Sequence, residues 1–268
     1  MNFNTLSWAA VLFYYRSAGD KQYGKIVSDV SFLDRLRRRP ESVDPEEFEK
    51  KVILDLVRVE DYNLLVGHAL ARRVLSGMVE HRSLLSPLLD MTILECNLSG
   101  TFTTDVINQV YSDIACVGGL WVTGGSKILH LLNESLFPML SPEIASTFGL
   151  VDNEFRMVEW MRFVQDNAKA VDADFKELGL AGSPGSFLSE RLGYAGAGFN
   201  KTLVKFLDEY FWIKYGDGLP VPPEWVPEPR DTDLAAVADS AIPVVEVGPP
   251  QANVAATTLP SQPAGKTM

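Results

Sequence analysis

The sequence contains little cysteine and little histidine, the residues from which many metal sites are built. Its two cysteines, Cys96 and Cys116, lie 20 positions apart and lack the paired spacing of a zinc site or a disulfide framework. We expect both to be reduced thiols in the core of a cytoplasmic protein. His68 has no second histidine or carboxylate at ligand spacing, so neither a metal nor any other cofactor is predicted.

Long hydrophobic runs are also missing. No uncharged run reaches the roughly 18 residues that a membrane-spanning helix needs, and the first apolar segment is interrupted at Arg16. No basic residues precede that segment, as they would in an export signal. The sequence therefore predicts a soluble protein with no membrane association.

Positive charge is in short supply. The chain has 24 Lys and Arg against 35 Asp and Glu, which gives a net charge of −11. This balance argues against a surface built throughout to hold nucleic acid, although a local basic stripe is compatible with it. Four arginines, Arg35, Arg37, Arg38 and Arg39, lie near a predicted helix end. Two interpretations are open for them: complementing the helix dipole or contacting phosphates.

The last 50 residues differ from the rest. From Leu219 onward the chain has ten prolines, and six acidic residues against two basic ones. Few large apolar residues are available there to offset the entropy of ordering the segment. We expect a folded body over residues 1–218 and a disordered, acidic tail over residues 219–268, which is also the predicted contact for a protein partner.

Apolar residues recur at helical spacing along the body, and no convincing alternating strand pattern appears. The predicted fold class is all-α. The loop-like segment 179–198 contains the string GYAGAGF, but no strand precedes it, which argues against a dinucleotide site. Helices are expected from the N-terminus to about Gly19, over 25–38, from 45, over 61–79, 84–97, 103–114, 123–132, from 141, and over 153–171, 187–192 and 201–215.

The most distinctive pattern lies in residues 114–150. A turn containing glycine leads into an apolar helix that ends at Leu132, and Ser141 begins another helix. Glycine in such a turn allows positive φ or close approach to another surface. The key strings are Gly119, Ser126-Lys127-Ile128-Leu129-His130-Leu131-Leu132, Leu136-Phe137-Pro138 and, near the end of the body, Lys201 to Tyr210.

These strings resemble the helix-hairpin-helix superfamily of DNA glycosylases and its uncharacterised bacterial relatives. The resemblance implies a glycosylase-like helical bundle that binds duplex DNA. Its implied DNA-repair task is to flip a damaged base out of the helix and cleave the N-glycosidic bond. Backbone amides of the hairpin would hold a DNA phosphate. The residues implied for phosphate contact are Gly118, Gly119, Thr123, Gly125, Ser126 and Lys127.

Three positions depart from the family pattern. The second turn glycine aligns with Trp121, and the lysine of bifunctional members aligns with Thr123, one turn before Lys127. The catalytic aspartate aligns with Ser141, whose neutral hydroxyl cannot stabilise a cationic sugar, so glycosylase activity may have been lost. The candidates for remaining chemistry are Lys127 as nucleophile, Ser141, and Asp152 or Asp208 as replacement carboxylates.

A plainer interpretation competes with this one. Ser141, Pro142 and Glu143 form an ordinary helix start. His130 can donate to a carbonyl, and Lys127 can be solvated. The alternative function is therefore a non-catalytic helical module for protein interaction.

Removing residues 219–268 tests the predicted tail. Because the tail is expected to bury nothing, the shortened chain should melt at the same temperature as the full chain. A calorimetric decrease of more than roughly 4 °C would instead mean that the tail stabilises the body.

Overall fold

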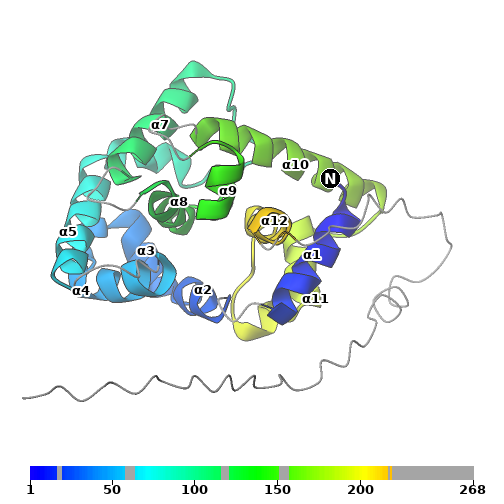
Figure 1. The fold of residues 1–268 in the computed structure, drawn as a ribbon, viewed down its shortest axis with the longest axis horizontal. Helices are drawn as coiled ribbons and strands as arrows, with labels where there is room; N and C mark the ends of the chain where they lie inside the picture. The colour runs from blue at the N-terminus through cyan, green and yellow to red at the C-terminus, as the bar shows by residue number, and fades with distance from the viewer. Residues whose placement is uncertain (17–19, 58–63, 116–120, 151–156, 217, 219–268) are drawn as a thin grey trace, which may run out of the picture. The chain divides into compact units, whose positions relative to one another are not determined.

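The computed structural model describes residues 1–16, 20–57, 64–115, 121–150, 157–216 and 218 (Figure 1). Helices and turns account for the regular structure in these ranges, and no strand occurs there, which confirms the all-α class. The chain divides into two compact units, Met1–Trp225 and Val226–Met268. Nearly all of the predicted tail, including the whole second unit, lies outside the described residues. None of the described helices is long and apolar enough to cross a membrane.

The body is built from short helices in a single continuous order. The first part contains α1 (Phe3–Arg16), α2 (Asp20–Val27), α3 (Val30–Arg38), η1 (Pro40–Ser42), α4 (Pro45–Phe48), η2 (Glu49–Val57), α5 (Leu64–Glu80), α6 (Arg82–Leu85) and η3 (Ser86–Leu88). The second part contains α7 (Thr101–Ala115), α8 (Trp121–Leu132), α9 (Pro142–Thr147), α10 (Met157–Glu177), α11 (Pro184–Arg191), η4 (Ala195–Ala197), α12 (Leu203–Phe211) and η5 (Trp212–Gly216).

One predicted helix, over residues 25–38, is divided into α2 and α3. The division falls at Asp29, whose carboxylate accepts the Phe32 N–H and so caps α3. The same carboxylate pairs with the Lys51 ammonium, 2.6 Å away. These contacts lower the pKa of Asp29, the Lys51 hydrogen bond most of all. A new helix therefore starts where the apolar spacing alone predicts continuation.

The helix predicted over residues 84–97 is wrong beyond Leu88. Residues 89–100 form turns and irregular chain. Their carbonyls do not need helical partners, because side chains from later in the sequence donate to them. The donors are Asn133, Arg162 and Gln165, and the acceptors are the carbonyls of Leu88, Met91, Ile93, Cys96 and Leu98.

The first helix of the chain packs with the last ones. α1 contacts α10, α11 and α12, and Phe3 lies edge-on against Phe175 and Phe187. α8 contacts α3, α7, α9 and η2 instead. Figure 1 shows α8 and α12 inside the surrounding helices of the body. Polar side chains on these two helices are therefore enclosed by the rest of the fold.

The buried thiol of Cys96 confirms the prediction of a core cysteine. Burial raises the pKa of this thiol, so its unreactive protonated form is favoured. Cys116 lies outside the described residues.

Candidate functional site

Ser126 is the first of the enclosed polar residues on α8. Its hydroxyl donates to the Thr123 carbonyl at 2.8 Å and accepts the Leu140 N–H at 2.9 Å. The side chain is fully buried. Ser126 therefore fastens α8 to the segment that leads into α9, with its hydrogen-bonding capacity directed into the protein.

His130 lies one turn further along α8 and is also fully buried. Its Nδ1 lies 2.6 Å from the Phe137 carbonyl, which confirms the predicted contact with a carbonyl. Its Nε2 lies 3.0 Å from the Tyr23 hydroxyl of α2. Burial lowers the pKa of His130 to about 3, and the positive charges of Lys205 and Arg37 act in the same direction. The imidazole is therefore neutral at pH 7.

Glu134 completes this group of contacts just beyond α8. The Tyr23 hydroxyl donates to its Oε2 at 2.8 Å, and the Arg37 guanidinium donates to its Oε1 at 2.8 Å. Arg37 also donates to the Leu131 carbonyl at 2.9 Å, near the end of α8. Arg37 thus ties α3 to the C-terminal end of α8.

The other arginines of the predicted patch also have acidic partners within the protein. Arg35 pairs with Glu47 at 3.0 Å, whereas Arg38 and Arg39 pair with Asp34 at 3.1 and 3.6 Å. These pairs support a structural use of the run. Phosphate contact by the exposed Arg38 and Arg39 stays a hypothesis.

Lys127 points from α8 toward η2, a nine-residue π-helix. Its Nζ donates to the Leu56 carbonyl at 3.1 Å, in the last turn of η2. A cation is favourable at a helix C-terminus because carbonyls there lack partners within the helix. The half-buried Lys127 is thus engaged with the protein instead of being simply solvated.

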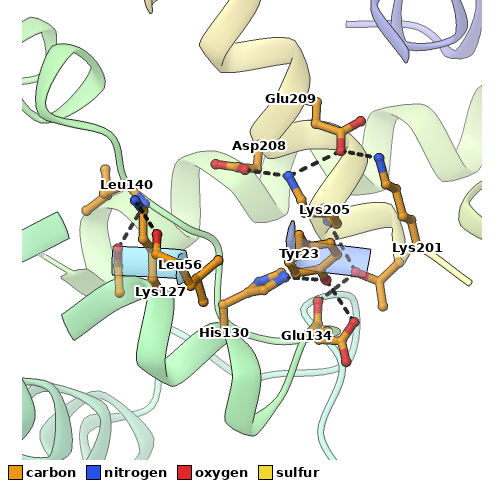
Figure 2. Close-up of polar contacts among 12 residues, drawn as sticks. Tyr23, Leu56, Lys127, His130, Glu134, Leu140, Lys201, Lys205, Asp208 and Glu209 are labelled. Atoms are coloured by element: carbon orange, nitrogen blue, oxygen red, sulfur yellow. Dashed lines mark hydrogen bonds and ion pairs between the residues drawn. The ribbon is translucent and has the colours of Figure 1, made fainter. Parts of the chain in front are cut away.

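A second group of charges lies on and before α12 (Figure 2). Glu209 Oε1 accepts from the ammonium groups of Lys201 at 2.6 Å and Lys205 at 3.1 Å. Lys205 also pairs with Asp208 at 3.2 Å. Lys201 lies 3.9 Å from the centroid of the Tyr194 ring, a cation–π contact. The charges therefore alternate in sign from the core outward to Asp208.

α11 fixes the position of Lys201. The Ser189 hydroxyl accepts the Lys201 N–H at 2.8 Å and donates to its carbonyl at 3.1 Å. Gly185 lies directly against the same segment, where a Cβ atom would approach the Leu203 nitrogen to 2.6 Å. Only glycine allows α11 to come this close.

Asp208 is the predicted carboxylate that the fold brings into range of Lys127. Its side chain is only 13% exposed, and this burial raises the pKa of its carboxyl above the usual value. Lys205 opposes the rise most strongly, and the charges of Lys127 and Lys201 oppose it further. Lys127 and Asp208, from α8 and α12, are therefore electrostatically coupled.

The remaining predicted residues have different surroundings. Ser141 caps α9, where its hydroxyl accepts the Ile144 N–H at 3.2 Å, so the helix-start prediction is confirmed. Thr123 is half-buried and Gly125 is buried. Gly118, Gly119 and Asp152 lie outside the described residues. Within the described ranges, no group of three His, Cys, Asp or Glu residues is arranged to hold a metal ion.

The sequence reasoning did not select Tyr23, Glu134, Lys201, Lys205 or Glu209. One signal was present: Lys201, Lys205 and Glu209 follow one another at intervals of four, among apolar residues. Charges at that spacing share one side of a helical segment. No comparable signal links Tyr23 to Glu134, because their contact depends on how α2 meets α8.

Comparison of the chain with protein-family models, curated proteins and solved structures gave no match.

Replacing Lys201 with methionine tests the buried charges. Glu209 would lose its closest cation while staying fully buried, so unfolding free energy should fall by about 3 kcal/mol or more. Lys176→Met is the matched control, because Lys176 is 72% exposed and pairs with Asp172 across one helical turn. Its cost should stay below about 1 kcal/mol. Denaturant unfolding of both variants that gave equal costs would contradict this account.

Proposed function

We propose that the chain binds duplex DNA as a helix-hairpin-helix protein related to DNA glycosylases, with Lys127 and Asp208 as its reactive pair. The observation that carries the proposal is the electrostatic coupling of these two residues. Each lies in one of the two strings that resemble the family. The pairing supplies a carboxyl group near Lys127, although the expected aspartate position is occupied by Ser141.

Lysine and a carboxylate suit reaction with an aldehyde, such as the ring-opened deoxyribose of an abasic nucleotide. The ammonium group must first lose a proton. Asp208, in its ionised form, is a stronger base than an exposed aspartate because burial raises its pKa. The free amine of Lys127 then bonds to the aldehyde carbon, and the carbonyl oxygen leaves as water to give an imine.

The proposed DNA contact is the beginning of α8. α7 and α8 pack against each other, and residues 116–120 connect them. The first-turn amides of a helix lack partners within the helix and carry partial positive charge, which favours a phosphate. Thr123 lies in this first turn, and Lys127 adds a positive charge one turn later.

The second candidate is a non-catalytic module for protein interaction. The observation in its favour is that Ser126, His130 and Ser141 direct their polar groups to contacts within the protein. The net charge of −11 also favours a protein partner over DNA.

Duplex binding separates these candidates. Lys127→Ala should weaken binding about equally for different sequences and reduce the salt slope by about one, because one phosphate contact is lost. Lys176→Ala, at an exposed site on α10, should change neither quantity. Fluorescence anisotropy with labelled duplexes at several salt concentrations measures both. If the unaltered chain shows no binding at low salt, DNA binding is excluded and the interaction module is favoured.

Borohydride trapping on a duplex with an abasic site tests the reactive pair. The unaltered chain should give a covalent adduct, because borohydride reduces the imine to a stable amine. Lys127→Ala should give none, and Asp208→Asn should form it on the order of 100-fold more slowly through loss of the base. Lys176→Ala should react normally. Duplex binding without any adduct would refute the reactive pair and leave DNA binding in place.

A further inference from the structure

The contacts around the Tyr23 hydroxyl need more hydrogens than the neutral network supplies. The Phe137 carbonyl can only accept, so the Nδ1 of His130 must carry a hydrogen. An ionised Glu134, held by Arg37, can likewise only accept from Tyr23. Tyr23 has one hydroxyl hydrogen but lies within hydrogen-bond distance of both Nε2 of His130 and Oε2 of Glu134, at 3.0 and 2.8 Å.

One of these two contacts therefore lacks a hydrogen when His130 is neutral. The lowered pKa of His130 makes that the state at pH 7. When Tyr23 donates to the carboxylate, Nε2 faces a hydroxyl oxygen without a hydrogen between them. Both side chains are buried, where an unmade hydrogen bond is costly.

We propose that Tyr23, His130 and Glu134 together form a binding site for one additional proton, which completes both contacts of the Tyr23 hydroxyl. The proton comes from solvent and has two equivalent positions. On Nε2, it points to Tyr23, which donates to Glu134. On Oε2 of Glu134, it also points to Tyr23, which then donates to Nε2. The two forms differ only in the position of hydrogens.

The surrounding charges set the conditions under which the site fills. Arg37 of α3 and Lys205 of α12 both disfavour an added positive charge at His130. The site therefore fills in acid and is empty at neutral pH. Its occupation strengthens the link between α2, which carries Tyr23, and the end of α8, one turn beyond Lys127 (Figure 2). This inference is independent of the proposed function.

The stability of Tyr23→Phe as a function of pH tests the site. Without the hydroxyl, His130 keeps a folded-state pKa far below its unfolded value of about 6.5. The unfolded chain then binds a proton that the folded chain does not, so stability falls as pH drops from about 6.5 toward 3. In the unaltered chain the folded network binds that proton too, and the loss is smaller.

The ratio of unfolding constants, variant over unaltered chain, should therefore rise on the order of tenfold between about pH 7 and about pH 4.5. If Tyr23 served only as a donor to Glu134, the ratio would fall instead, because a protonated carboxyl accepts more weakly than a carboxylate. A constant or falling ratio in denaturant titrations overturns the proposal.

Glu134→Gln provides the matched background. The glutamine amide supplies a permanent hydrogen toward Tyr23, which is then free to donate to Nε2 at every pH. In this background the effect of Tyr23→Phe should no longer depend on pH. Tyr111→Phe, at another buried tyrosine, should also have a pH-independent effect. A pH dependence that persists with glutamine at position 134, or that Tyr111→Phe reproduces, overturns the proposal.

Nitrogen NMR of the unaltered full chain covers the case in which Tyr23→Phe does not fold. Filling the site places a hydrogen between Nε2 and Tyr23 in both forms. The Nε2 resonance of His130 should therefore shift between about pH 7 and about pH 4.5 while the protein remains folded. An Nε2 resonance that stays constant over this range overturns the proposal.

Discussion

The burial of α8 is the constraint on which the rest of the body depends. A helix enclosed on most sides cannot leave its terminal carbonyls to water, so other segments must supply donors. Arg37 donates to the Leu131 carbonyl, and the Thr202 hydroxyl donates to the Glu134 carbonyl at 2.7 Å. Asn133 in turn donates to two carbonyls of the irregular segment that follows η3. The end of α8 thus fixes the positions of α3, of the start of α12 and of a long non-helical stretch at once.

The charges around α12 follow a different principle. An ion pair at a fully buried position adds little net stability compared with apolar residues of the same shape. It does restrict which arrangements of the helices are possible, because any other arrangement leaves a buried charge without its partner. Lys201 and Lys205 both lie over the ring of Phe13, at 5.4 and 5.3 Å from its centroid. The orientation of α1 against α12 is therefore specified by charge and aromatic contacts together.

What the sequence predicted correctly is mostly local. Ser141 caps its helix through an amide three residues away, so its role can be found from neighbouring letters alone. The segment 84–97 was mispredicted because Asn133, Arg162 and Gln165 satisfy its carbonyls from far along the chain. The same limit applies to the candidate site. Lys127 and Asp208 were selected individually, but their coupling depends on how α8 and α12 are placed in the fold.

The π-helix η2 has a consequence for how the sequence can change. Hydrogen bonds from i to i+5 enclose one more residue in each bonded loop than those of an α-helix. Over Glu49–Val57, the chain therefore holds a residue that an α-helix joining the same two ends does not require. A one-residue deletion can be absorbed here by a change of hydrogen-bond pattern, with both ends of the segment kept in place. In an ordinary α-helix the same deletion rotates everything that follows by about 100°. Length variation in η2 is thus compatible with an unchanged partner for Lys127.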